Sequence, residues 1–147
     1  MPYLTPKQLI KLTANGQAHG NDHTPVVRLT SLSDNREWLL TEVFNQELAY
    51  GLFESEGKIV LDYIPLQELD SYTSNGEKNA VREFIFTKED IENAGVVSDV
   101  AFEGQYPISI YQKVSEHLGF IFSDNTKLAE ILKSFKSDKP LNKNKGP

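Results

Sequence analysis

Three short apolar segments joined by brief polar links restrict the fold of this chain more than any other feature. EWLLTEVF, LAYGLFE and KIVLDYI follow one another between residues 37 and 64. Short segments that are rich in branched and aromatic residues are typical of β-strands. Because such short links join neighbouring strands as hairpins, we predict an antiparallel meander.

Other segments predict a strand before the meander and helices at both ends of the chain. PVVRLTSL, residues 25–32, is rich in branched residues and is read as a strand. A proline at the first turn and Asn-Gly at the end bound a helix over residues 6–16. Apolar residues at helical spacing predict helices over residues 108–118 and 125–136.

The segment between the meander and the last helices adds further elements. Residues 81–86 and 96–102 are read as strands, with a short helix over residues 88–95 between them. The predicted fold class is therefore α+β. It consists of a small antiparallel meander sheet of four to six strands, with a short N-terminal helix and two C-terminal helices packed on it.

The length of the chain, 147 residues, suits one domain with one core. We predict a single α+β domain over residues 1–137, and the polar stretch at 71–80 is an alternative internal boundary. Residues 138–147 have little to bury and are predicted to form a disordered basic tail.

Alternation along residues 37–44 predicts which side chains share a face of the sheet. Strict alternation places Glu42 with Trp38 and Leu40, and it places Val43 on the opposite face. Both faces are partly apolar. We therefore expect one face to lie on the core and the other to be covered by a helix or a partner.

Charge is distributed unevenly. Residues 126–147 carry six lysines against Glu130 and Asp138, a net of +4, which leaves −10 for the rest of a chain whose net charge is −6. Residues 34–103 hold sixteen Asp and Glu against five Lys and Arg. A body this negative repels a phosphate backbone, so direct contact with nucleic acid is expected only through the lysine tail. The tail is either a solvated end or an electrostatic anchor.

Several function classes lack their sequence signals. The chain has no cysteine, which excludes disulfides, thiolate zinc sites and cysteine nucleophiles. It has no apolar run of membrane-spanning length and no secretory leader, so we expect a soluble, cytoplasmic protein. Nucleophile-elbow, P-loop and dinucleotide motifs do not occur. We therefore predict no catalytic residue and no cofactor.

The first half of the chain carries a series of phrases in a fixed order. They are LTPKQLIKLTANGQA, TPVVRLTSLSDNREWLLTEV, LAYGLFE and LDYIPLQEL, within residues 3–70. This order resembles an uncharacterised bacterial family of small proteins, often carried on plasmids and integrated mobile elements and classed as a domain of unknown function. The resemblance implies a genomic setting and a fold, and it carries over no catalytic residue.

The loop AHGNDH holds weak candidates for a metal site. His19 and His23 flank Asp22 at HxxxH spacing, which could offer two imidazoles and a carboxylate to a metal ion. Such pairs work when a helix sets both rings on one face, whereas Gly-Asn-Asp favours a loop, where histidines are usually solvated. His117 lies near the end of its helix, where the dipole favours a cation, and this role is preferred to that of a general base.

Acidic residues on the predicted strands form the main candidate binding site. They are Glu37, Glu42, Glu47, Glu54 and Asp62. Carboxylates on adjacent strands could act as an acid–base pair or hold a hard cation. The simpler interpretation is a solvated face whose acids protect the sheet edge from pairing. Aromatic residues of the same strands could stack bases, but the surrounding acids favour core packing instead.

These patterns together favour a non-enzymatic binding protein whose acidic surface engages a basic partner protein. In the mobile-element setting that the resemblance implies, the partner could be a host defence or nucleic-acid-handling protein, which would make the function counter-defence. One alternative is a metal-dependent hydrolase or nuclease using His19, Asp22 and His23. Another is a nucleic-acid-binding accessory factor acting through the C-terminal helices and the lysine tail. The oligomeric state is left open.

Overall fold

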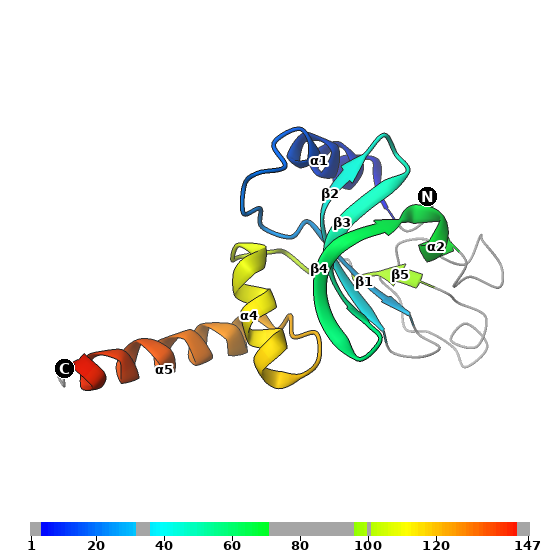
Figure 1. Ribbon diagram of the computed structural model, residues 1–147. Coiled ribbons are helices and arrows are strands. Elements are labelled where there is room, and N and C mark those ends of the chain that lie inside the picture. The colour runs from blue at the N-terminus through cyan, green and yellow to red at the C-terminus, as the bar shows by residue number, and fades with distance from the viewer. Residues whose placement is uncertain (1–3, 32–35, 71–95, 100, 144–147) are drawn as a thin grey trace.

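The computed structural model describes residues 4–31, 36–70, 96–99 and 101–143, which form an α+β fold (Figure 1). Its elements are α1 (Pro6–Gly16), β1 (Val27–Ser31), β2 (Glu37–Phe44), β3 (Leu48–Ser55), β4 (Lys58–Pro65), α2 (Leu66–Asp70), β5 (Val96–Ser98), α4 (Ile108–Leu118) and α5 (Asn125–Lys143). The strands form one five-stranded sheet in the order β4-β3-β2-β1-β5. All neighbours are antiparallel. This confirms the predicted α+β meander with its N-terminal and C-terminal helices.

Two tight hairpins connect β2, β3 and β4. Asn45 and Gln46 both have positive φ, 53° and 56°, and the Glu47 N–H donates to the Phe44 carbonyl at 3.0 Å. Glu56 and Gly57 likewise have φ of 52° and 80°. Two consecutive residues of positive φ are the type I′ turn that matches the twist of the flanking strands. The short links therefore set both the antiparallel pairing and its register.

Helix α1 begins with a capping box and packs closely on β2. The Thr5 hydroxyl accepts from the Gln8 backbone N–H at 3.1 Å, and the Gln8 side chain accepts from the Thr5 N–H at 2.9 Å. At the other end, the Asn15 side-chain amide donates to the Thr41 carbonyl of β2 at 3.0 Å. A Cβ on Gly16 would lie 2.7 Å from the Val43 carbonyl oxygen, so glycine permits this approach.

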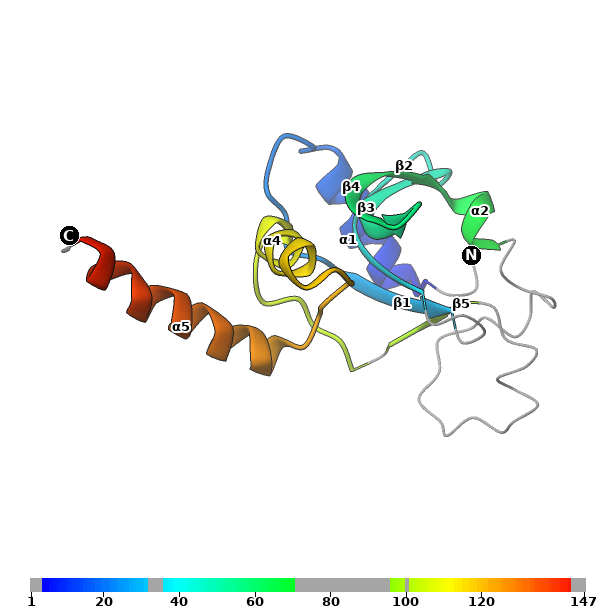
Figure 2. The same ribbon diagram turned by 60° about the horizontal axis from the view of Figure 1, so that its bottom comes forward.

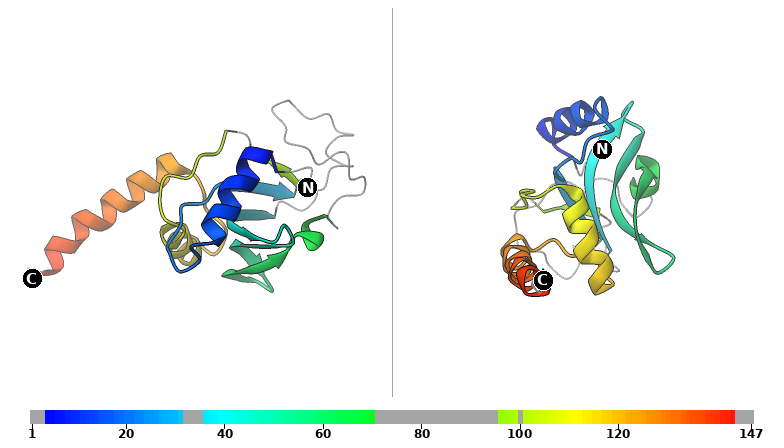
Figure 3. Two further views of the ribbon diagram at one scale, coloured as in Figure 1. Left: turned by 90° about the horizontal axis from the view of Figure 1, so that it is seen from above. Right: turned by 60° about the vertical axis from the view of Figure 1, so that its left-hand side comes forward.

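The sheet carries a hydrophobic core on each face. One core joins α1 and α2 to the sheet, and its members include Leu12, Leu40 and Leu69. The other joins α4 and the start of α5 to the sheet, and its members include Leu52 and Tyr111. Figures 2 and 3 show α4 against the sheet and α5 running away from it.

Strict alternation in β2 is wrong beyond Leu40. The pairing of β2 with β3 shifts between Leu40 and Glu42, which marks a β-bulge. A bulge adds one residue to a strand and thereby exchanges the faces of the residues that follow it. Val43 consequently joins Trp38 and Leu40 in the α1 core. Glu42 points to the opposite face, the one that α4 covers.

The last helix is longer than the sequence indicates. The Asp124 carboxylate accepts from the Lys127 N–H at 3.1 Å at its start, and Leu128 is buried in the core that α4 shares. The helix continues to Lys143, so it includes residues 138–143, which the sequence assigns to a disordered tail. The predicted strand 81–86, the helix 88–95 and the alternative boundary 71–80 lie outside the described residues. In the part of the chain that is described, no helix combines the length and apolarity needed to cross a membrane.

Candidate functional site

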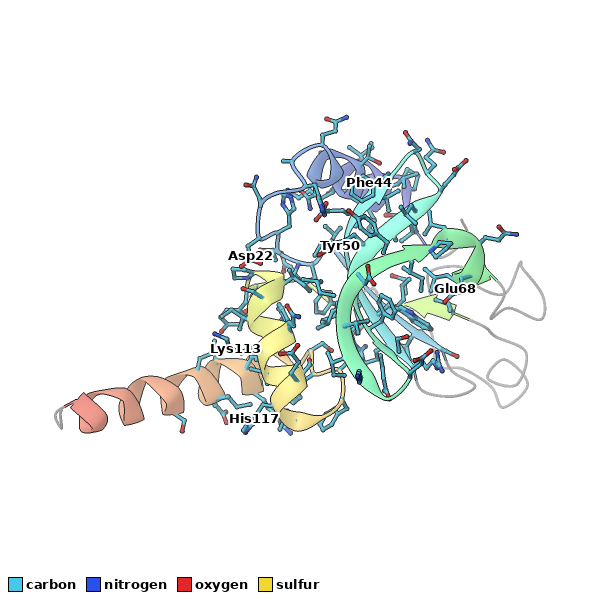
Figure 4. The ribbon with its side chains drawn as sticks, viewed as in Figure 1. Asp22, Phe44, Tyr50, Glu68, Lys113 and His117 are labelled. Atoms are coloured by element: carbon cyan, nitrogen blue, oxygen red, sulfur yellow. The ribbon has the colours of Figure 1, made fainter. Side chains whose placement is uncertain are left out.

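The three residues of the predicted metal loop have separate contacts. Asp22 accepts from the Ser109 backbone N–H at 3.1 Å and from its hydroxyl at 2.5 Å, and so caps the start of α4. His23 Nε2 donates to the Ala18 carbonyl at 2.8 Å, which closes the loop on itself. Figure 4 shows Asp22 at the end of α4 nearest to that loop. His19 is directed elsewhere, to the sheet.

No group of three His, Asp or Glu side chains that could hold a metal ion occurs among residues 4–31, 36–70, 96–99 and 101–143. The alternative of a metal-dependent hydrolase or nuclease stays a prediction from the sequence. His117, in the last turn of α4, contributes to a small hollow of about 260 Å³ between α4 and α5.

His19 makes a hydrogen bond to a carboxyl group in the sheet. Its Nδ1 lies 2.6 Å from Oε1 of Glu42, whose side chain is only 2 % exposed. A carboxylate accepts, so Nδ1 carries the proton of this hydrogen bond. The other ring nitrogen, Nε2, lies 3.1 Å from the hydroxyl of Tyr63. Burial of a carboxyl group is costly without a hydrogen-bond partner, and His19 is that partner for Glu42.

Aromatic rings surround the His19 imidazole on the sheet. Its centroid lies 5.6 Å from that of Phe44, 5.0 Å from that of Tyr50 and 5.8 Å from that of Tyr63. Figure 4 shows Phe44 and Tyr50 on the sheet between α1 and α4. Burial raises the pKa of the Tyr50 phenol, and the Glu42 carboxylate raises it further. The imidazole is thus held by rings and a carboxylate together.

The five predicted acids do not form one continuous surface. Glu42 is buried and paired with His19, while Asp62, opposite Gly51 in the strand register, points to the face that α1 covers. Glu47 is exposed at the β2–β3 hairpin, and Glu54 is exposed near the β3–β4 hairpin. Alternation alone could not place Glu42, because the bulge reverses its face.

Glu37 belongs to a network around Arg28. The Arg28 guanidinium donates to Glu37 at 2.8 Å, to Asp99 at 2.7 Å and to the Ser123 hydroxyl at 2.9 Å. Burial disfavours its charge, but the hydrogen bonds and charges of Glu37 and Asp99 outweigh this, so the pKa of Arg28 is raised above its ordinary value. The network ties β1 and β2 to the residue that follows β5 and to the segment before α5.

An acid-lined hollow of about 410 Å³ lies beside this network. Its lining residues are Arg36, Glu37, Trp38, Glu54, Glu56, Gly57, Phe120 and Ile121. Trp38 is buried, whereas Phe120 is 52 % exposed. Within the described residues, no hydrogen bond or ion pair engages the carboxylates of Glu54 and Glu56. This "acid-lined hollow" combines negative charge with an aromatic wall.

The sequence identified part of this hollow. Glu37 and Glu54 are two of the five predicted binding residues, and both line it. Glu56 and Phe120 were missed, because Glu56 reads as a turn residue and Phe120 lies outside every periodic segment. The sequence favours core packing over base stacking for Tyr50 and Tyr63, and nothing local in the sequence links them to His19.

Residues 3–92 match the protein family described as "Protein of unknown function (DUF2958)". No curated protein matches the chain. No solved structure matches it either.

Proposed function

We propose that this chain, which belongs to the DUF2958 family of unknown function, is a non-enzymatic binding protein. Its acid-lined hollow would bind a basic side chain of a partner protein. The observation that carries the proposal is the position of Glu54 and Glu56. Both line a hollow of about 410 Å³, and no described residue neutralises either one.

The chemistry of the lining supports a side chain that is both long and positively charged. The lining contains Glu54, Glu56 and one cation, Arg36, besides Glu37, which is paired with Arg28. The lining therefore carries an excess of negative charge. Arginine and lysine place an apolar stem below a charged head. The exposed ring of Phe120 can cover such a stem, and an aromatic face also attracts a cation. An anionic ligand would meet repulsion here.

The setting of the proposal comes from the resemblance to proteins of plasmids and mobile elements. In a bacterial cytoplasm, the partner would be a host defence or nucleic-acid-handling protein whose basic DNA-binding surface the hollow occupies. Complementary charge would speed and orient such an encounter more than it would tighten it. The charge of the surrounding sequence also favours a basic partner, because residues 34–103, which include the acids of the hollow, carry sixteen acids against five basic residues.

Binding of a short oligo-arginine peptide tests the proposal directly. At low ionic strength, the wild-type chain should bind the peptide, and Glu54→Gln combined with Glu56→Gln should weaken binding about tenfold, as expected for the loss of two close charges. Glu47→Gln is the matched control, because Glu47 is an exposed acid at the other hairpin. Titration calorimetry gives both affinities.

The response to salt completes the test. Added salt should weaken peptide binding by the wild-type chain, because exposed charges are screened within about 10 Å at 0.1 M salt. Equal affinity of the double variant and of Glu47→Gln would overturn the proposal. If the double variant does bind more weakly, a pull-down from host lysate would identify the partner. The proteins captured by the wild type and by the double variant would be compared by mass spectrometry.

A further inference from the structure

The surroundings of His19 have the composition of a receptor for an organic cation. The imidazole contacts a buried residue, Glu42, and three aromatic rings, those of Phe44, Tyr50 and Tyr63. Aromatic rings within about 6 Å of a cation attract it through their faces, and cages of such rings recognise alkylated ammonium groups. In this protein, the His19 imidazole lies among these groups, in the place that a bound cation would take. We name Glu42 and Phe44 of β2, Tyr50 of β3 and Tyr63 of β4 the aromatic box.

The strand register brings the residues of the aromatic box together. Glu42 is paired with Tyr50 across β2 and β3, and Tyr50 is paired with Tyr63 across β3 and β4. Phe44 follows Glu42 on the same face. The rings of Tyr50 and Tyr63 also contact each other, with centroids 4.9 Å apart. Strand pairing therefore sets the backbone positions of these residues, which do not depend on the loop that carries His19.

The occupant comes from a different part of the chain. His19 lies in the loop that follows α1, and its neighbours in that loop are fixed by their own contacts. Asp22 caps α4, and His23 bonds the Ala18 carbonyl. These anchors do not pass through the His19 ring. The ring is 44 % exposed, so solvent reaches the box beside it.

We propose that the aromatic box binds an organic ammonium group that retains an N–H, with His19 as its built-in competitor. The carboxyl group of Glu42 is 2 % exposed and needs a hydrogen-bond partner. An alkylated ammonium with one N–H offers that donor to Glu42 and presents its methyl groups to the rings. The acid-lined hollow, with its different residues, is not part of this site.

Vacating the box tests the proposal. The probe is trimethylammonium chloride, and binding is followed by NMR of the full chain. His19→Ala should bind trimethylammonium at least about tenfold more tightly than the wild type does, because the competitor is removed. His23→Ala is the matched control. It removes a histidine from the same loop without opening the box, and should bind as the wild type does.

Two comparisons identify the contacts. Tetramethylammonium, which has no N–H, should bind His19→Ala more weakly than trimethylammonium. Adding Glu42→Gln to His19→Ala should remove most of the gain, whereas adding Glu54→Gln, in the acid-lined hollow, should leave it unchanged. The proposal for the acid-lined hollow and the proposal for the aromatic box can therefore fail independently of each other.

The wild-type chain provides a test that does not depend on the folding of the variants. Trimethylammonium at high concentration should shift the NMR signals of the His19 ring and leave those of His23 in place. If neither the His19 signals nor the affinity of a folded His19→Ala variant changes, the imidazole is only a structural partner of Glu42, and the proposal is overturned.

Discussion

Single residues decide where the strands of this sheet can approach one another. Gly51 lies opposite Leu40 in the pairing of β2 with β3, next to the bulge. A Cβ at this position would lie 2.2 Å from the Leu39 carbonyl oxygen and 2.9 Å from the Leu40 Cα. Both are backbone atoms of a paired strand and cannot rotate away. The bulge that turns Glu42 towards His19 thus depends on a residue without a side chain.

Gly51→Ala should therefore destabilise the protein strongly. We expect the free energy of unfolding to fall by about 2 kcal/mol or more, since the strand must shift to relieve the overlap. Denaturant unfolding followed by tryptophan fluorescence measures this change. Gly20→Ala is the matched control, because a Cβ at Gly20 has no atom within 4 Å. A loss in Gly51→Ala no greater than that in Gly20→Ala would contradict the account of the bulge.

Among the elements, α4 is positioned by the loop that also carries His19. Its N-terminal residue, Ile108, donates its backbone N–H to the His23 carbonyl at 2.8 Å, and Asp22 accepts from Ser109. The preceding residue, Pro107, makes no side-chain cap. A residue 87 positions earlier in the chain thus supplies the cap that the local sequence lacks. The HxxxH loop therefore has a structural role that its spacing does not indicate.

Asp22→Ala should weaken this junction. We expect a loss of about 1 kcal/mol in the free energy of unfolding, the usual cost of removing an N-terminal cap. Asp22→Ser retains an acceptor and should recover part of the loss. Thermal and denaturant unfolding of both variants provide the measurement. Equal stability of Asp22→Ala and the wild type would show that the contact with Ser109 contributes nothing.

At the scale of the whole molecule, Tyr111 of α4 connects segments around the core that α4 and α5 form with the sheet. It is fully buried, its hydroxyl donates to Asn125 at the start of α5, and it accepts from the Gln105 N–H at 3.1 Å. Burial raises the pKa of Tyr111 above the ordinary value of a phenol. Burial also raises the pKa of Tyr50. In both cases the folded state favours the neutral phenol.

Stability should consequently decrease at alkaline pH. A raised pKa in the folded state means that the stabilising contribution is complete below the ordinary pKa of about 10 and is lost as the pH rises through the folded value. Denaturant unfolding at a series of pH values above 9 should show this decline, and tyrosinate absorbance should report the ionisation. In Tyr111→Phe the decline should be smaller. A free energy of unfolding that stays constant up to pH 11 would contradict the prediction.

Local sequence patterns predict most of the elements. The hairpins, β1, α1 and α4 follow from local patterns, because turn residues, caps and apolar periodicity act over a few neighbouring residues. It also identified Glu37 and Glu54 of the acid-lined hollow, since both acids lie on predicted strands. The expected domain of unknown function and the expected α+β fold are both confirmed.

The composition of the candidate sites depends on tertiary packing. The contact between His19 and Glu42 spans 23 residues and requires a bulge that reverses the strand alternation. The hollow combines β2, the β3–β4 hairpin and the segment after α4. Long-range contacts of this kind depend on how elements pack, and packing is a property of the whole chain, which no local pattern contains.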